Sequence, residues 1–297
     1  MHITDLSEYA LFRGLTASLG ILPGSISLAG LRAAGRLVRR RGWFRAELAR
    51  VQVAAAFPDW EPERIDATVK GMFDHLALMA HEVWGRDRKK VRTRCRVPRG
   101  WDPLEEGLAS GRGLILASAH LGNFEWCGRL IASRHRLLDV VKPQRNRWFD
   151  RDLDRMRRAA GIDTVPVDGA GPAVMRRLKQ GGVVSLLLDQ DAGAAGVRTR
   201  FFGRPASTWP GAARLSLQLD CPVLPVCLIR LPDHGHELVW GAPLDPRDLP
   251  ATAAHPGAYT QLISDSLEAF IRLHPEQWFW VHRRWKGADE AQVPQEP

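Results

Sequence analysis

The sequence is poor in cysteine, and its few cysteines follow no recognisable pattern. Among 297 residues there are four, Cys95, Cys127, Cys221 and Cys227, with no CxxC pair and no metal-ligand spacing. This argues against a disulfide scaffold and a zinc ribbon, and it favours unpaired thiols in a reducing compartment. We therefore expect neither a bound metal nor a cofactor.

Lysine is also scarce, so the positive charge is carried by arginine. Only six of the 42 basic residues are lysines, and with 33 acidic residues the formal net charge is +9. Such an excess favours polyanionic partners, which include nucleic acid, phosphorylated lipid surfaces and acidic carrier proteins. A hydrophobic content of 45% and a charged content of 25% exclude a disordered or fibrous chain.

The N-terminus lacks a cleavable secretory signal, because Asp5 and Glu8 precede the apolar stretch and no basic segment does. We therefore expect the chain on the cytosolic side. Residues 14–31 are uncharged and approach the length of a bilayer span, but Pro23 and four glycines weaken that interpretation.

A basic cluster over residues 36–45 surrounds Trp43 and Phe44. Cations beside aromatic rings are typical of a segment that lies at an anionic membrane face. A buried helical hairpin with a solvated basic edge is the alternative. We assign residues 1–50 to an N-terminal membrane-associating helical segment, 51–286 to the main domain and 287–297 to a disordered tail.

The hydrophobic pattern predicts an α/β fold. Residues 58–84 read as an amphipathic helix with Asp59 as its cap. Strands are expected over residues 113–119, 137–141, 164–167, 183–188, 222–229 and 237–240, with helices over 147–160, 172–179, 208–219 and 259–273. This alternation predicts a mostly parallel central sheet covered by helices.

Residues 118–126 read SAHLGNFEW, with His120 at the end of an apolar strand and Glu125 in the opening of the next element. On one regular helix, residues five apart lie about 140° apart, so Gly122 must relax the chain for the two side chains to converge. Converged, they would form a general base whose second ring nitrogen is held by an acid. Ligands of open α/β sheets gather at this strand end.

HLGNFEW resembles the His-x4-Asp/Glu signature of glycerolipid-type acyltransferases, in the form found in the lipid A biosynthesis late acyltransferases (lauroyl and myristoyl transferases). Four further blocks agree in order: AAAFPD from 54, VKPQRNRWFDRDLDRMRRAAG from 141, DQD from 189 with FFG from 201, and PEQWFWVHRRWK from 275. The resemblance covers about residues 50–286, and its DQ…FFG and PEQW…HRR blocks are specific.

The resemblance implies a glycerolipid acyltransferase-like fold and a direct transfer without an acyl-enzyme. His120 would accept the proton of an acceptor hydroxyl that attacks the thioester of an acyl carrier protein, and Glu125 would orient the imidazole. Backbone N–H groups just after His120 would stabilise the oxyanion. The implied acceptor is a lipid A precursor of the Kdo-lipid A type, at the cytoplasmic face of the cell inner membrane.

The resemblance also implies a set of substrate-binding residues. Arg157, with Lys142 and Arg145, would meet phosphates, which suit the planar fork of a guanidinium. Asp189 ends an apolar strand, so we expect it at the same sheet edge as His120, where it would orient a substrate or cap the local loop. The complete set is Asn123, Lys142, Arg145, Asn146, Arg157, Asp189 and Gln190.

Alternative functions differ in the partner they require. Some relatives act on another glycolipid or aminolipid; mycobacterial mannoside acyltransferases typically carry aspartate in the acid position, so Glu125 favours the lipid A branch. A nucleic-acid-binding protein is a different class, and the sequence has no recognised binding motif for it. The expected partners are therefore an acyl carrier protein, a phosphorylated glycolipid and anionic membrane lipids, with no nucleic acid.

His234 and His236 share one face of an expected strand, which could suggest a metal site. The flanking Asp233 and Gly235 favour an exposed turn instead.

Overall fold

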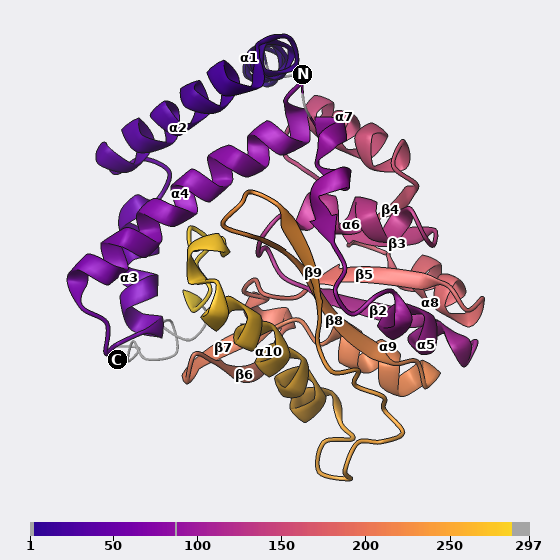
Figure 1. Cartoon of the computed structure of the whole chain (residues 1–297). Coiled ribbons are helices and arrows are strands. Elements are labelled where there is room, and N and C mark those ends of the chain that lie inside the picture. Colours follow the sequence, from indigo (N-terminus) through magenta and orange to yellow (C-terminus); the bar gives the residue numbers. More distant parts are fainter. Residues whose placement is uncertain (1–2, 87, 287–297) are drawn as a thin grey trace.

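A computed structural model describes residues 3–86 and 88–286; the tail expected over 287–297 lies outside the described residues. Its main sheet contains β1 (Cys95–Arg96), β2 (Leu114–Ser118), β3 (Leu137–Val141), β4 (Ile162–Pro166), β5 (Val183–Leu187), β8 (Val223–Arg230) and β9 (His236–Trp240). The strand order is β1-β9-β8-β2-β5-β3-β4 (Figure 1). Only the β8–β9 pair is antiparallel within these described strands, so the expectation of a mostly parallel sheet is confirmed.

Both faces of this sheet are covered by helices, because the central strands bury side chains on both sides. The covering helices are α5 (Asp102–Ala109), α6 (Phe124–Ala132), α8 (Gly171–Lys179), α9 (Gly211–Leu219) and α10 (Pro256–Leu273). Along β2, Ile115 and Ala117 join the core with α8, α9 and α10, whereas Leu114 and Leu116 join a second core with α6. A continuous apolar run is the signature of such a strand.

The sequence did not predict the small hairpin of β6 (Val197–Phe201) and β7 (Arg204–Thr208). Phe202 and Gly203 form its turn with φ of 52° and 72°. The hairpin packs against α10. The FFG block of the sequence is therefore a tight turn whose two Phe rings are buried.

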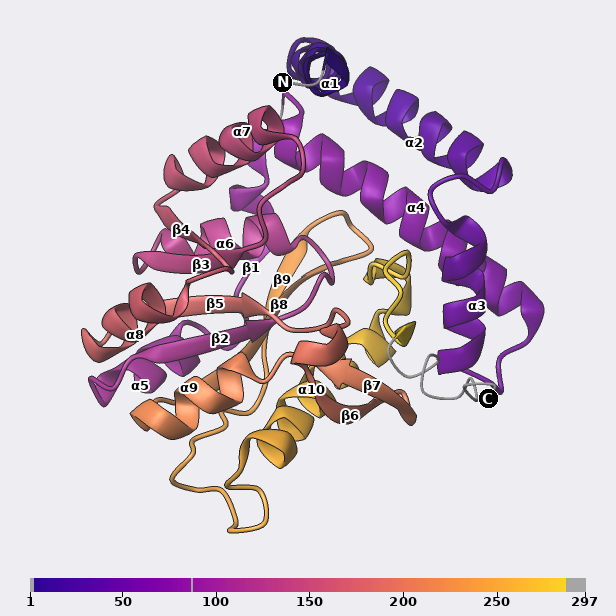
Figure 2. The ribbon, with the colours of Figure 1, turned by 180° about the vertical axis from the view of Figure 1, so that it is seen from behind.

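Four helices precede the sheet: α1 (Ile3–Ile21), α2 (Gly24–Arg40), α3 (Ala46–Ala56) and α4 (Pro62–Trp84). Helix α2 packs along α4, and α1 and α2 form an outer layer beyond α4 (Figures 1 and 2). The expected cap Asp59 is wrong, because α4 begins at Pro62 with Glu61 as its N-cap residue.

The uncharged stretch over residues 14–31 is divided between two helices at Pro23. Within the described ranges, no helix is long and apolar enough to cross a membrane. Helices α1 and α2 are joined by a short turn, but α2 packs mainly along α4 and little against α1, so they do not form the hairpin of the alternative interpretation. Nor are they buried, because only Leu19 and Ser27 are buried between residues 5 and 40.

The remaining elements include α7 (Arg147–Arg158), which packs against β4 and α1 at the edge of the sheet. Four short 3₁₀ helices complete the described chain: η1 (Arg88–Lys90), η2 (Arg92–Arg94), η3 (Gly193–Ala195) and η4 (Pro275–Gln277).

Candidate active site

His120 lies just beyond the carboxyl end of β2, and its imidazole is held by Asp189 from just beyond the end of β5. The Nδ1 atom is 2.9 Å from Asp189 Oδ1, and the backbone N–H of His120 donates to Oδ2 at 2.9 Å. Trp278 Nε1 donates to the same Oδ2 at 2.6 Å. A carboxylate at Nδ1 assigns the ring proton to that nitrogen, which leaves the lone pair of Nε2 free.

The pairing of His120 with Asp189 follows from the register of the sheet. Ser118 on β2 lies opposite Leu187 on β5 in a parallel ladder. Two residues further along each chain, His120 and Asp189 therefore lie side by side. The alternation of strands in the sequence does not reveal that β2 and β5 are neighbours, so this contact needed the three-dimensional sheet order.

Asp189 is ionised in this environment although it is only 2% exposed. Burial alone would raise the pKa of its carboxyl group. The charge of the imidazolium and the hydrogen bonds from His120 and Trp278 outweigh burial and lower the pKa to about 2. A fixed negative charge therefore lies behind the imidazole.

Glu125 does not hold the imidazole, which corrects the sequence expectation. Its carboxylate pairs with Arg157 on α7: Nη2 donates to Oε1, and Nε lies 3.4 Å from Oε2. Because Asn123 is the N-cap of α6, Glu125 is the second residue of that helix and its side chain reaches α7. Within the described chain, no hydrogen bond or ion pair joins Glu125 to His120.

The loop from His120 to Asn123 is held by its own backbone. Gly122 has φ of 59°, and a Cβ there would overlap the carbonyl of Leu228, so glycine is required. The N–H groups of Gly122 and Asn123 donate to the carbonyls of Gln277 and Leu228, at 3.1 and 2.9 Å. These two N–H groups are therefore not free for an oxyanion, while the wider expectation that N–H groups after His120 stabilise one stays a prediction.

Other side chains surround the free nitrogen of His120. Gln190 Nε2 lies 3.5 Å from His120 Nε2, and the rings of Phe124 and Phe279 lie 5.1 and 6.2 Å from the imidazole. The side chain of His120 is 21% exposed, so its free nitrogen has access to a ligand. Gln190, which the sequence predicts as a substrate-binding residue, therefore lies beside the candidate base. Its contact with a substrate stays a prediction.

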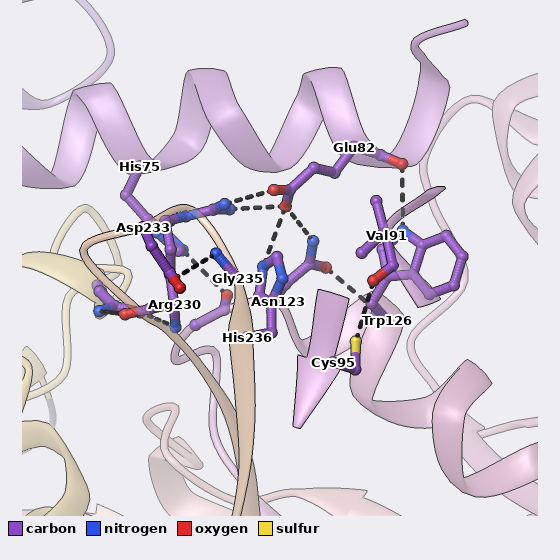
Figure 3. A network of polar contacts seen from close by, with 12 residues as sticks. His75, Glu82, Val91, Cys95, Asn123, Trp126, Arg230, Asp233, Gly235 and His236 are labelled. Carbon is purple, nitrogen blue, oxygen red and sulfur yellow. Dashed lines mark hydrogen bonds and ion pairs between the residues drawn. The ribbon is translucent and has the colours of Figure 1, made fainter. Parts of the chain in front are cut away.

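A buried polar network lies behind the His120 loop (Figure 3). Glu82 on α4 accepts two hydrogen bonds from Arg230 on β8 and one from Asn123 Nδ2 at 2.7 Å. His236 Nε2 on β9 is 3.3 Å from the same carboxylate. Burial would raise the pKa of Glu82, but the hydrogen bonds from Arg230 and the proximity of His236 lower it to about 2.

Two sequence expectations fail at this network. Asn123 is fully buried, and its side chain caps α6 through Trp126 N and donates to Glu82, so it is not available to a substrate. His236 is 1% exposed and faces Glu82 rather than standing in an exposed turn. Burial of a charged group requires such partners, which β9 and α6 supply.

His75 connects this network to the loop and must be neutral. Its Nε2 lies 3.1 Å from the carbonyl of Gly122, and its Nδ1 accepts from Arg230 Nε at 3.3 Å. Burial and the nearby Arg230 charge lower the pKa of His75 to about 4. His75 and Glu82 are seven residues apart on the buried face of α4, and this polar spacing within an apolar stripe is the signal that could have found them.

The other predicted binding residues lie at the connection from β3 to α7. Lys142 is exposed. Arg145 forms an ion pair with Glu8 at 2.8 Å, and Asn146 caps α7 and donates to the carbonyl of Asp5 at 2.7 Å. Two of these three side chains therefore fasten α1 to α7, while their contact with a substrate stays a prediction.

The mostly parallel α/β sheet thus carries a carboxylate-held histidine at the edge where ligands of open α/β sheets bind. The chain matches the family described as bacterial lipid A biosynthesis acyltransferase over residues 2–287, and it belongs to that family. The resemblance noted in the sequence is thereby confirmed.

Relatives within this family differ in their named acceptors. The chain is 30% identical to phosphatidylinositol mannoside acyltransferase of Mycobacterium tuberculosis (strain ATCC 25618 / H37Rv) over 207 residues, which cover 67% of this chain and 62% of the relative. The match therefore spans less than two thirds of that relative's length. It is 26% identical to the lipid A biosynthesis lauroyltransferase of Escherichia coli K12 over 272 residues, covering 86% and 84%. The palmitoleoyltransferase of the same strain is 24% identical over 247 residues, covering 82% and 79%.

The first testable consequence concerns His75. Because its folded pKa of about 4 lies below the ordinary 6.5, the unfolded chain takes up the proton first as the pH falls. The stability that His75 contributes is therefore present above pH 6.5 and is lost between pH 6.5 and about 4. Relative to His75→Gln, which keeps a donor and an acceptor but does not titrate, the native protein should lose about 3 kcal/mol over this range. Urea unfolding at a series of pH values measures the difference, and a constant difference would contradict it.

The second consequence concerns the Glu125–Arg157 pair, whose side chains are 12% and 19% exposed. Removing one partner leaves the other charge buried without a counter-charge. Arg157→Met should therefore lower the free energy of unfolding by about 3 kcal/mol, and adding Glu125→Gln should restore part of this stability. Arg158→Met on the same helix is the control, because its pair with Asp154 is exposed and should contribute below about 1 kcal/mol. Urea unfolding of the double-mutant cycle tests the coupling, and strictly additive losses would exclude it.

Proposed function

We propose that this protein transfers a fatty acyl chain from the thioester of an acyl carrier protein to a hydroxyl group of a lipid A precursor. The observation that supports this most directly is the free Nε2 of His120, opposite an Nδ1 held by the ionised Asp189. Membership of the bacterial lipid A biosynthesis acyltransferase family supports the same reaction class.

In the proposed reaction, one proton passes from the acceptor hydroxyl to His120 and then to the leaving thiolate. His120 Nε2 takes the proton of the acceptor hydroxyl as its oxygen attacks the thioester carbonyl, and Asp189 stabilises the imidazolium that forms. Collapse of the tetrahedral intermediate breaks the carbon–sulfur bond. The departing thiolate then takes the proton from the imidazolium, which yields an ester and a free carrier thiol.

Two neighbouring groups refine this proposal. The Gln190 amide, 3.5 Å from His120 Nε2, is placed to donate a hydrogen bond to an oxygen at the reaction centre. The thiol of Cys127 is buried, and burial raises its pKa well above the ordinary value, so it supplies no thiolate nucleophile. Transfer therefore proceeds directly from donor to acceptor.

For Arg157 we infer a positioning role, while the phosphate contact expected from the sequence stays a prediction. Its guanidinium is already paired with Glu125, so a phosphate at Arg157 would have to replace an existing ion pair. Instead, the pair fixes α7 against α6 beside the base. Of the predicted phosphate ligands, Lys142 is exposed at the end of β3.

A second acceptor class is favoured by one specific observation, the 30% identity to a mycobacterial phosphatidylinositol mannoside acyltransferase. Mass spectrometry of total lipids from cells with and without the gene separates the two acceptors. Loss of one acyl chain from lipid A supports the lipid A precursor. Loss from another glycolipid, with lipid A unchanged, would overturn that acceptor and retain the acyl transfer.

The base and its carboxylate are tested by substitution. His120→Ala should lower kcat/KM by about 10²- to 10⁴-fold. Asp189→Asn should fall nearly as far, because an amide nitrogen would face the N–H donors of His120 and Trp278 or displace the Nδ1 proton. Glu125→Gln should lose less than Asp189→Asn, since its carboxylate does not touch the ring.

A carrier-dependent assay in micelles, with Asp191→Asn as the control beside Asp189, measures these effects. Activity of Asp189→Asn within a few-fold of the native protein would reject its role, and so would equal losses in Asp189→Asn and Asp191→Asn.

The N-terminal helices provide the membrane-binding surface in this proposal, at the cytoplasmic face of the inner membrane. Large apolar side chains are exposed along α1, α2 and the turn that follows: Leu6, Leu11, Leu15, Ile21, Leu22, Ile26, Leu37, Trp43 and Phe44. Exposed Arg36, Arg40 and Arg41 lie in the same segment. Apolar side chains next to cations suit insertion into the boundary of an anionic leaflet.

Neutralising Arg36, Arg40 and Arg41 to Gln should weaken binding to anionic vesicles by about 1 kcal/mol per residue at low salt. Turnover in micelles should be nearly unchanged, because within the described chain no hydrogen bond, ion pair or cation–ring contact joins these three residues to His120 or Asp189. The matched control removes the same charge from the exposed Arg176, Lys179 and Arg198. Vesicle sedimentation over a salt series measures binding, and equal losses in the two triple variants would refute a localised membrane surface.

A further inference from the structure

A groove of about 480 Å³ lies between α1, α4, α6 and α7, apart from the residues around His120. Its apolar lining is Phe12, Ala17, Val83, Trp84, Leu153 and Met156. Four arginines also line it: Arg13, Arg88, Arg129 and Arg155. The groove therefore combines a hydrocarbon-like wall with positive charge, and its volume is in the range of ligand sites.

Two of the four arginines are already compensated by one carboxylate. Asp152 accepts from Arg13 at 3.2 Å and from Arg155 at 3.0 Å, and Tyr9 Oη donates to it at 2.9 Å. Among the described residues, no carboxylate lies within ion-pair distance of Arg88 or Arg129. Within the described chain, Arg88 and Arg129 are therefore the arginines of the groove that have no ion-pair partner.

Arg129 is the side chain that most needs an anion, because two of its N–H donors are buried without an acceptor. The Nε and Nη2 atoms have no hydrogen-bond partner within the described chain, and the guanidinium lies 5.1 Å from the centre of the Trp126 ring. Burial lowers the pKa of Arg129, the charge of Glu125 raises it, and the charges of Arg157 and Arg88 lower it, so that the pKa is lowered overall. Desolvated, unpaired donors are costly unless an anion satisfies them.

We infer that this groove binds an anionic phospholipid, with its phosphate at Arg88 and Arg129 and one hydrocarbon chain along Phe12, Trp84 and Met156. A phosphate accepts bidentate hydrogen bonds from a guanidinium, and the apolar wall favours an attached chain over free phosphate. Helix α1 lines the groove and also carries exposed leucines of the proposed membrane-binding surface. The lipid can therefore come from the adjoining leaflet.

Occupation of the groove would act on the candidate active site through α6 and α7. Arg129 lies one turn after Glu125 on α6, and Met156 is adjacent to Arg157 on α7. A lipid that contacts both helices would therefore stabilise the Glu125–Arg157 pair. The binding itself does not depend on the acyl transfer proposed above, and its test measures binding rather than turnover.

The probe is dihexanoylphosphatidylglycerol below its critical micelle concentration, titrated calorimetrically into the full chain. We expect saturable binding at one site that Arg88→Gln and Arg129→Gln each weaken by about tenfold or more. Arg155→Gln is the matched control, since Asp152 already compensates that charge, and it should change the affinity by less than about twofold. Ala17→Trp keeps every arginine but fills the groove, so it should also weaken binding about tenfold.

Inorganic phosphate and octyl glucoside are each titrated alone. Phosphate measures what the headgroup charge contributes to binding, and octyl glucoside measures what the hydrocarbon chain contributes. The inference requires both to bind much more weakly than the phospholipid. Equal binding of inorganic phosphate would reduce the site to an anion site, and equal binding of octyl glucoside would reduce it to an apolar groove; either result overturns the lipid assignment. Equal losses in Arg129→Gln and Arg155→Gln, or full binding in Ala17→Trp, would also overturn it. Circular dichroism confirms that each variant is folded.

Discussion

The buried carboxylate of Glu82 is the interaction on which the His120 loop depends. It is a single acid on α4 that accepts hydrogen bonds from β8 and the start of α6 and lies within ion-pair distance of His236 on β9. Leaving such a charge buried without partners would cost several kcal/mol, so the four elements must come together for any of them to be stable there. Arg230 then extends the contact to His75, which lies against the carbonyl of Gly122. The position of the loop is thus determined by charge satisfaction as well as by apolar packing.

Asp189 applies the same principle at the front of the loop. Both carboxylates are buried and ionised, with pKa values lowered to about 2 by donors that outweigh desolvation. Glu82 acts on the backbone and on α6, whereas Asp189 acts on the imidazole itself. A histidine held in one tautomer on a fixed loop needs little rearrangement before it accepts a proton, which is the condition for efficient general-base chemistry.

The sequence predicted the strands well because each central strand is a continuous apolar run, as in residues 183–188, which contain β5. It located His120 correctly at a strand end. It assigned the partner carboxylate to Glu125 because that residue is near in sequence, whereas the parallel register brings Asp189, 69 residues away, to the ring. The contacts of Glu82 could not be predicted either, since the sequence of an amphipathic helix does not show which distant residues will pair with a single acid on it. The local hydrophobic pattern thus predicted the helices and strands. The pairing of strands distant in sequence determined which carboxylate contacts the imidazole.

Helix α6 shows how one short element connects these regions. Asn123 at its N-cap binds Glu82, Glu125 two residues later binds Arg157 on α7, and Arg129 one further turn along lines the groove beneath α1. Because neighbouring positions on a helix point in different directions, one helix can contact the buried network, α7 and the groove at once. Glu125, which the sequence assigned to the imidazole, therefore has a structural role instead. Its ion pair with Arg157 links α7, and through α7 also α1, to the helix that begins four residues after the proposed base.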